Sequence, residues 1–173
     1  GNQRIEGVTV TKVDENMEPI KETERFIECD LLVLSVGLIP ENELSKKANV
    51  KMSPITKGPL LDENMMTNIP GIFAAGNVST VFDLVDYVSE TGELAARGAS
   101  KYIGKQKEID EPIEIKAGEN IASILPSKLN IHNIEEKLSL YMRAKKTMKN
   151  CTLKVFLNGK LVHNQNLPIV RPA

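Results

Sequence analysis

The stretch TNIPGIFAAGNV, residues 67–78, decides the fold expected of this chain. Pro70 and Gly71 supply a turn, and the apolar run 72–75 behind them is short enough for a buried strand of a parallel sheet. Gly76 ends that run where the backbone has to bend, and it leaves no side chain to keep a ligand away. Ligands of open α/β sheets bind at the carboxyl ends of strands. The stretch therefore predicts a strand followed by a binding turn.

A second apolar run and a long helix accompany this stretch. Residues 31–36, LLVLSV, are β-prone and almost continuously apolar, as expected of a strand buried on both faces. A helical pattern starts at Phe82 and stops near Gly104. Gly92 and Gly98 lie inside it, and each costs about 1 kcal/mol relative to Ala in an exposed helix. Tight helix–sheet packing is the favoured explanation for Gly98, whereas such packing and ligand approach both stay open for Gly92.

The chain before and after this part has simpler patterns. Residues 4–13 and 26–29 indicate strands, and residues 41–48 indicate a short helix. After a charged linker at 105–108, apolar and polar residues alternate with the period of two that is typical of strands. The pair Asn158-Gly159 between two such runs predicts a hairpin with a type I′ turn.

Composition narrows the class of protein. The 173 residues carry 22 basic and 23 acidic side chains and no Trp, which argues against a nucleic-acid partner. The longest apolar run is far shorter than the roughly 20 residues that span a bilayer, so no membrane span is expected. Cys29 and Cys151 form no C-x-x-C pair, which favours free thiols and a cytoplasmic location.

Other chemistry finds little support in the sequence. His132 and His163 lie outside ligand spacing of any cysteine or carboxylate cluster, so exposed loop histidines are favoured over metal ligands. The acidic residues of 83–93 are favoured as a solvated helix face. The basic residues of 143–149 fit a sheet edge guarded by lysine, with a docking surface for a partner subunit as the alternative. We assign no catalytic residue and no metal ligand.

Two segments carry a family likeness. CDLLVLSVGLIPENEL, residues 29–44, and TNIPGIFAAGNVSTVFDLVDYVSETGELAARGASKYI, residues 67–103, together resemble the two-dinucleotide flavoproteins of the pyridine nucleotide–disulfide oxidoreductase group. The resemblance implies an α/β plus all-β chain, namely an incomplete FAD/NAD(P) fold followed by a small antiparallel β domain. The implied parts are the end of the NAD(P)-binding domain at 1–49, the carboxyl part of the FAD-binding domain at 50–105, and a β-sandwich-like domain at 106–173.

The tail carries a second, weaker likeness. IEIKAGENIASILPSKL at 113–129, LYMRA at 140–144 and VRPA at 170–173 are similar to the carboxyl β domain of flavin oxidoreductases associated with anaerobic glycerol-3-phosphate dehydrogenase. This likeness implies a dehydrogenase subunit as partner. It predicts no oligomeric state.

The resemblance also implies the cofactor-binding residues. It places Gly76 beside the ribityl-pyrophosphate of FAD, with the N–H of Val78 directed to the same part. Asn77 stands where the family has an Asp that accepts a hydrogen bond from a ribityl hydroxyl. The amide of Asn77 can still accept one hydrogen bond, but it carries no charge. The residues nearest the flavin ring would be Ser89, Glu90, Thr91 and Gly92. Gly37 would lie beside the nicotinamide domain.

The chain lacks other parts of such an enzyme. No G-x-G-x-x-G phosphate loop and no redox-active cysteine pair occurs in it. The sequence therefore predicts the carboxyl third of a longer oxidoreductase that passes electrons between NAD(P)H, FAD and a partner or small-molecule substrate, and a chain that is inactive by itself. The alternative is a non-catalytic module that docks onto partner subunits through its β domain.

Overall fold

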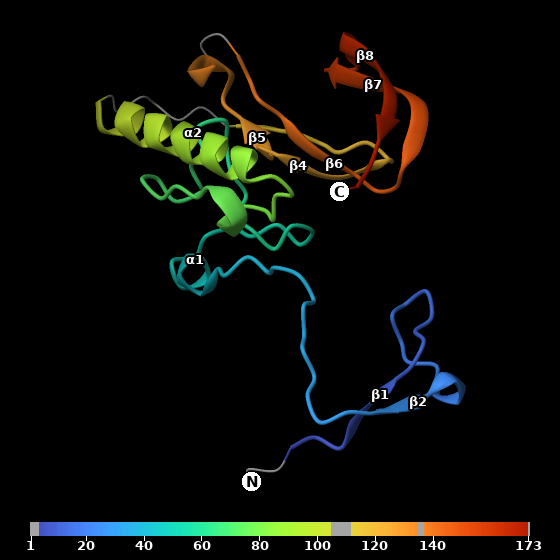
Figure 1. The fold of residues 1–173 in the computed structure, drawn as a ribbon. Coiled ribbons are helices and arrows are strands. Elements are labelled where there is room, and N and C mark those ends of the chain that lie inside the picture. Colours follow the sequence, from blue (N-terminus) through green and yellow to red (C-terminus); the bar gives the residue numbers. More distant parts are fainter. Residues whose placement is uncertain (1–3, 105–111, 135–136, 173) are drawn as a thin grey trace. The chain divides into compact units, whose positions relative to one another are not determined.

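The computed structural model describes residues 4–104, 112–134 and 137–172. The chain divides into two compact units, Gly1–Gly37 and Leu38–Ala173 (Figure 1). Each unit is described by itself.

The first unit is a two-stranded antiparallel ribbon. Strands β1 (Gly7–Val10) and β2 (Arg25–Glu28) pair in register from Gly7 opposite Glu28 to Val10 opposite Arg25. A 3₁₀ turn, η1 (Lys21–Thr23), precedes β2. The predicted strands are confirmed, although β1 is shorter than residues 4–13 because its continuation forms only a single bridge, between Val13 and Pro19.

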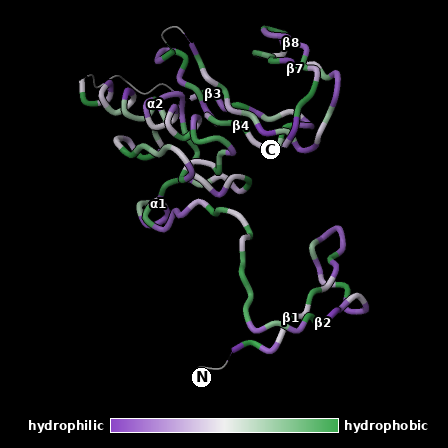
Figure 2. Tube along the Cα trace, in the orientation of Figure 1, coloured by the Kyte–Doolittle hydropathy of each residue, from purple (hydrophilic) through white to green (hydrophobic). Residues whose placement is uncertain are grey.

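The apolar run at 31–36 was predicted to form a strand buried on both faces, and the structure contradicts this prediction. It is extended without strand pairing, and Figure 2 shows it in green along an open trace. Val33 and Val36 are 79% and 86% exposed. A strand buried on both faces needs a neighbour on each edge and a layer on each face. The described residues supply none of these to the run, so it is not the buried strand that was predicted.

The second unit is organised around one long helix. Helix α2 (Val85–Gly104) confirms the helix predicted from Phe82, with its first turn three residues later. Helix α1 (Glu43–Lys47) lies inside the predicted 41–48 segment, and Asn49 behind it has the left-handed φ of 59° that ends many helices. The buried core consists of Leu61, Met65 and Leu125, with Ala74, Phe82, Leu94, Ala95 and Tyr141 packed against it.

The run at 72–75 also differs from its prediction. It makes no parallel pairing within the described residues, and its one bridge joins Phe73 to Met66 in antiparallel orientation. Backbone bonds join the run to residues 65–67, from Ala74 N to Met65 O at 3.0 Å and from Thr67 N to Ile72 O at 2.9 Å. A parallel strand requires a crossover to a second strand, so the run pairs with the nearest available segment instead. Gly76–Val78 continues as a 3₁₀ turn, η2.

The tail consists of short antiparallel pairs. Strand β3 (Ile113–Glu114) pairs with β5 (Lys128–Leu129), and β4 (Ile121–Leu125) pairs with β6 (Tyr141–Ala144). A 3₁₀ turn, η3 (Ile131–Asn133), separates β5 from β6.

The predicted hairpin is confirmed. Strands β7 (Met148–Leu157) and β8 (Lys160–Val170) pair in antiparallel orientation around the two-residue loop Asn158-Gly159. Both loop residues have positive φ, 50° and 78°, as a type I′ turn requires.

The tail is hydrogen-bonded to the segment before α2. Leu61 O accepts a bond of 2.9 Å from Ser127 N, and a Glu63 carboxylate oxygen accepts one of 2.8 Å from Asn130 N. Residues 38–173 therefore form one unit, as expected for a tail too small to stand alone. The boundaries proposed at 49 and 105 remain predictions, and the linker at 105–108 lies outside the described residues.

Three further features concern only the part of the chain that the structure describes. No helix there is both long and apolar enough to cross a membrane. No group of three His, Cys, Asp or Glu side chains there is placed to hold a metal ion. Cys29 and Cys151 are free thiols.

Candidate functional site

The turn at Gly76 is fastened to the inner face of helix α2. Gly76 has a φ of 60°, in the left-handed region that favours glycine. Its N–H donates to the Thr91 hydroxyl at 3.0 Å, and that hydroxyl lies 2.9 Å from Tyr87 O and 3.0 Å from Val88 O. Thr91 is fully buried. One threonine therefore fixes the distance between the turn and the helix.

A second group of contacts holds the turn from the other side. The side-chain amide of Asn42 donates to Val78 O at 3.0 Å and to Lys57 O at 3.3 Å. The Ser79 hydroxyl donates to Gly76 O at 2.6 Å. A Cβ on Gly58 would lie only 1.8 Å from Ser79 O, so only glycine lets the loop approach so closely.

Sequence reasoning missed this second group. The signal for Asn42 was present, because an Asn directly before a short helix favours a side chain that bonds to nearby backbone. Its actual partners lie 15 and 36 residues away, and no local pattern announces a bond of that length. The role of Gly58 was likewise hidden, since a glycine beside a proline indicates a turn equally well.

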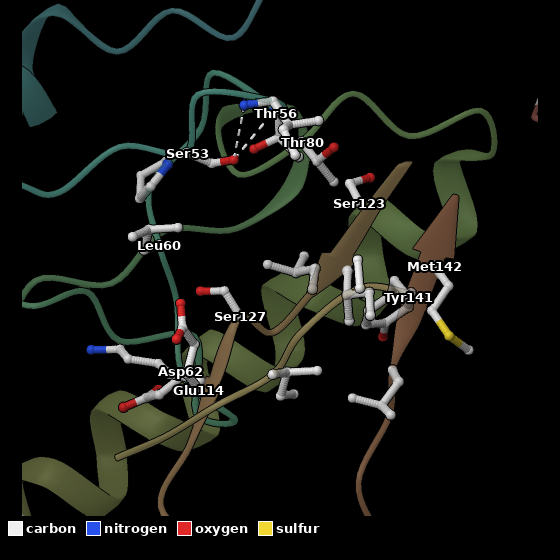
Figure 3. Close-up of a pocket in the computed structure, with 18 of the residues that line it drawn as sticks. Ser53, Thr56, Leu60, Asp62, Thr80, Glu114, Ser123, Ser127, Tyr141 and Met142 are labelled. Carbon is white, nitrogen blue, oxygen red and sulfur yellow. Dashed lines mark hydrogen bonds between the residues drawn. The ribbon is translucent and has the colours of Figure 1, made fainter. Parts of the chain in front are cut away.

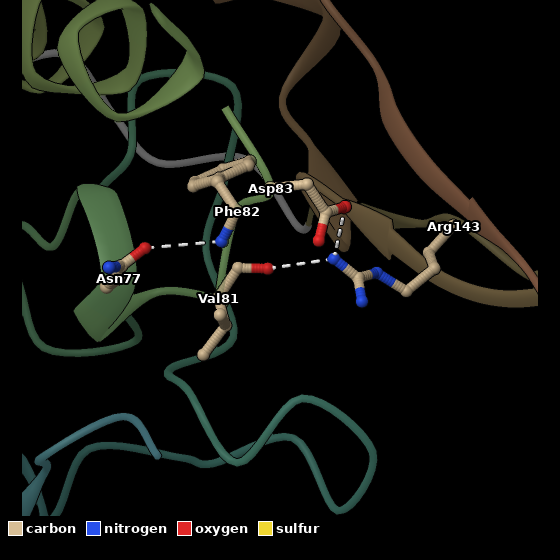
Figure 4. Close-up of polar contacts among 5 residues, drawn as sticks. All are labelled: Asn77, Val81, Phe82, Asp83 and Arg143. Carbon is tan, nitrogen blue, oxygen red and sulfur yellow. Dashed lines mark hydrogen bonds and ion pairs between the residues drawn. The ribbon is translucent and has the colours of Figure 1, made fainter. Parts of the chain in front are cut away.

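The outer side of the turn is open. Asn77 and Val78 are exposed. Figure 4 shows the Asn77 side-chain oxygen accepting from Phe82 N at 3.2 Å, which leaves its amide N–H groups as donors. The first N–H groups of a helical turn have no partner within it. This side therefore offers hydrogen-bond donors.

The chain after the turn is fixed by the tail. Arg143 of β6 donates from Nη2 to Val81 O at 3.0 Å and to the Asp83 carboxylate at 2.8 Å (Figure 4). Phe82, Tyr87 and Tyr141 pack edge-on or tilted, with ring centroids 5.6–6.1 Å apart. Arg143 thus bonds within the chain, whereas Lys145, Lys146 and Lys149 of the basic segment are exposed.

The residues predicted near the flavin ring separate into two groups. Ser89, Glu90 and Gly92 are exposed on α2, and a Cβ on Gly92 would meet no atom within 4 Å. Thr91 faces inward to the turn, so its hydroxyl is engaged inside the protein. Gly98 confirms the packing expected of it, because a Cβ there would lie 2.2 Å from Asn64 O. Its neighbour is a loop rather than a strand.

Gly37 belongs to the first unit and is described apart from the turn. Its φ is 95°, and a Cβ there would meet no atom within 4 Å. Its predicted role beside a nicotinamide domain remains a prediction, as do the roles of the other predicted site residues.

A cavity of about 1190 Å³ lies between loop residues 51–70 and tail residues 112–143. Glu90 and Tyr87 of α2 also line it, so the cavity reaches the helix segment predicted near the flavin. Figure 3 shows Asp62 and Glu114 together, with Tyr141 and Met142 in another part of the wall. Its charged lining residues are of both signs: Lys51, Asp62, Glu90, Glu114, Lys116, Lys128 and Arg143.

Asp62 is a buried carboxylate at this cavity. Its Oδ1 accepts from Asn64 N at 3.0 Å and from Met66 N at 2.8 Å. Burial, and to a smaller degree the charge of Glu63, raise its pKa to about 6 despite these bonds. Asp62 therefore changes charge close to physiological pH.

Tyr141 also departs from its ordinary state. Its hydroxyl oxygen is shielded from solvent and has no hydrogen-bond partner within the described part of the chain. Burial first, and then the Glu90 carboxylate, raise the pKa of Tyr141 above its usual range. The phenol is neutral at every physiological pH.

Comparison with known proteins identifies the family of the chain. Residues 3–100 match the family described as pyridine nucleotide-disulphide oxidoreductase. The chain belongs to this family, whose members depend on FAD and NAD(P). The match covers the β1–β2 ribbon, the turn at Gly76 and most of helix α2.

Individual relatives support the same family. The chain is 36% identical over 107 residues to the 34.2 kDa protein in the rubredoxin operon of Clostridium pasteurianum, covering 60% of this chain and 32% of the relative. It is 36% identical over 98 residues to a thioredoxin reductase of Listeria monocytogenes, covering 55% and 28%. It is 38% identical over 52 residues to a ferredoxin–NADP reductase of Picrophilus torridus, covering 30% and 16%.

These matches span a third or less of each relative. No solved structure matches the chain.

Proposed function

We propose that these residues form the carboxyl-terminal part of a flavin-dependent NAD(P)H oxidoreductase and contribute one side of its FAD site. The observation that carries this proposal is the turn at Gly76. Hydrogen bonds of three buried residues, Thr91, Asn42 and Ser79, fix its inner side, while Asn77 and Val78 stay exposed. A turn that is rigid inside and offers donors outside suits a polar ligand.

The residues present fit FAD on this side. On the exposed side of the turn, Asn77 offers amide donors next to the exposed Val78. The ribityl chain carries hydroxyls and the pyrophosphate carries charge, so donors at the turn match both. When bound, FAD would supply the hydride chemistry, while this chain would position and tune it. The helix start at Val85 would favour negative charge nearby.

The chain lacks a phosphate-binding loop, so we propose that it retains no FAD by itself and is inactive alone. Other parts of the longer protein would supply that loop and the partners for the exposed run at 31–36. We further propose a cytoplasmic enzyme of the type associated with anaerobic glycerol-3-phosphate dehydrogenase, working with a dehydrogenase subunit. The sequence of the tail is the support for this finer assignment.

The gene sequence upstream of Gly1 tests the proposal. An in-frame segment encoding G-x-G-x-x-G after a strand supports it, and a stop codon directly before this chain contradicts it. In the longer polypeptide, Asn77→Asp should tighten FAD binding, because Asp keeps the oxygen that accepts from Phe82 N and its charged second oxygen accepts from a ribityl hydroxyl more strongly than the lost amide N–H donates to it. Asn16→Asp, on the exposed surface of the first unit, is the matched control and should leave flavin affinity unchanged.

A non-catalytic docking module is the second candidate. The long β7–β8 hairpin favours it, because its strands pair only with each other among the described residues. An upstream stop codon together with stable binding of a dehydrogenase subunit to this chain would select the module over the enzyme.

A further inference from the structure

The last part of the chain differs in charge from the remainder. From Lys137 to Ala173 there are eight Lys and Arg residues and no Asp or Glu, whereas the preceding residues hold all 23 acids and the other 14 bases. The near-zero net charge of the whole chain hides this asymmetry. A concentrated positive surface attracts anionic partners.

The end of the β7–β8 hairpin combines this charge with exposed apolar side chains. Four large apolar residues flank the Asn158-Gly159 turn and are 45% or more exposed. They are Phe156 at 59%, Val162 at 55%, and Leu157 and Leu161 at 45% each. Lys154 and Lys160, both exposed, lie beside them. We call residues 154–162 the hairpin tip.

The apolar side chains of the tip lie on both faces of the ribbon. Phe156 is paired with Leu161, and Leu157 is paired with Lys160. Because successive residues of a strand point to opposite faces, Phe156 and Leu161 share one face and Leu157 lies on the other. Val162 is the extra residue where the pairing shifts beside Val155 and Phe156. A tip that is apolar on both faces suits immersion in an apolar medium, whereas a flat protein interface would cover one face.

We propose that the hairpin tip inserts into the surface of an anionic lipid bilayer. The two or three residues on each side of the turn reach about 7–10 Å along the strands, which is the depth of the boundary between headgroups and acyl chains. The apolar side chains enter that boundary. Lys154 and Lys160 keep their ammonium groups at the level of the phosphates.

Two comparisons favour lipid over other anionic partners. A nucleic-acid phosphate backbone would use the lysines but would leave four apolar side chains in water. The other exposed apolar run, at 31–36, lies in a unit with eight acids and four bases, so an anionic bilayer repels it. The tip combines four exposed apolar side chains with two exposed lysines and no acid.

Sedimentation with vesicles tests the proposal on the 173-residue chain. It should bind vesicles of mixed phosphatidylglycerol and phosphatidylcholine and should bind pure phosphatidylcholine vesicles much more weakly. The double variant Lys154→Gln, Lys160→Gln should bind the anionic vesicles about 25-fold more weakly, at about fivefold per lysine. Lys46→Gln, Lys47→Gln makes the same charge change on exposed residues of α1 and should bind like the parent chain.

A matched pair tests the apolar contribution. Phe156→Ser, Leu157→Ser removes one apolar side chain from each face and should weaken binding about tenfold or more. Leu44→Ser, Ile55→Ser removes two apolar side chains that are 81% and 64% exposed elsewhere and should not weaken it.

A single fluorophore reports insertion directly. The chain has no Trp, so Phe156→Trp introduces the only one, and its emission should shift to the blue on anionic vesicles and be quenched by brominated lipid. Leu44→Trp should show neither change. An unshifted emission from the Phe156→Trp variant, or vesicle binding that is equal in the tip and control variants, overturns the proposal. Both outcomes are independent of whether the longer protein holds a flavin.

Discussion

The two apolar runs of this chain, 31–36 and 72–75, have nearly the same sequence character and very different surroundings. The first is open to solvent. The second is half-buried, with a bridge to Met66 and with Ala74 packed against the core. An apolar run thus becomes structured where its own chain supplies a partner. The segment 61–67 and helix α2 do so for the second run, and the described residues offer the first run nothing comparable.

Two glycines of α2 test how closely the helix packs on the loop 61–67, which pairs with the run at 72–75. Gly98→Ala should destabilise the chain by about 2–3 kcal/mol, because its Cβ would lie 2.2 Å from Asn64 O. Gly92→Ala should stabilise it by up to about 1 kcal/mol, since the site is open and Ala favours helix. Urea unfolding of both variants measures the difference, about 2–4 kcal/mol. Equal effects would mean that α2 does not pack on the loop.

Asp62, in the loop that pairs with the run at 72–75, gives a test by pH. The folded-state pKa of Asp62 is raised from 3.8 to about 6, so the folded state binds more protons between these values and stability falls as pH rises through this window. Asp62→Asn keeps an acceptor for Asn64 N and Met66 N and should gain up to about 3 kcal/mol above pH 7.

The same Asp62→Asn substitution should have little effect near pH 3, where the carboxyl group is protonated in both states. Unfolding free energies at several pH values measure both limits. A gain that is the same at pH 3 and pH 7.5 would show that the charge of Asp62 is not its cause.

Loss of the hydrogen bond between Gly76 N and the Thr91 hydroxyl should lower the free energy of unfolding by a smaller amount. Thr91→Val keeps the shape of the buried side chain but removes the oxygen that accepts from Gly76 N. An unsatisfied buried N–H costs about 1–3 kcal/mol. Ser89→Ala, on the exposed face of α2, is the control and should stay within about 0.5 kcal/mol of the parent. Hydrogen exchange at Gly76 should accelerate in the Thr91→Val variant and remain slow in the control.

The first run should be nearly insensitive to substitution. Val33→Ser replaces a side chain that is 79% exposed and should change the stability of this chain by less than about 0.5 kcal/mol. In the proposed longer protein the same substitution should be strongly destabilising, because the run would then be covered on both faces. A large loss in this chain alone would show that the run is already buried.

The sequence predicted local features well and long-range contacts poorly. Helix α2 and the hairpin turn at Asn158-Gly159 follow from periodicity and turn chemistry within a few residues, and both were found. The strand at 31–36 was wrong because apolar character indicates what a segment would bury, while the partner that buries it is a property of the rest of the fold.

The site shows the same limit. Gly76 and Asn77 stood out as a glycine and a small polar residue after an apolar run. Asn42 and Gly58, which hold the turn from 18 or more residues away, carried no signal that distinguishes them from ordinary helix-start and loop residues. The tail bond from Arg143 to Asp83 spans 60 residues and was equally invisible to local patterns.

Flavin retention tests the central claim, that this chain holds one side of an FAD site whose other parts lie outside these residues. The chain and the longer polypeptide would be purified in parallel with FAD in excess, and their visible absorbance measured after removal of free flavin. We expect no flavin on the chain alone and one flavin per longer polypeptide. One flavin bound per molecule of the chain alone, or none on the longer polypeptide, would contradict it.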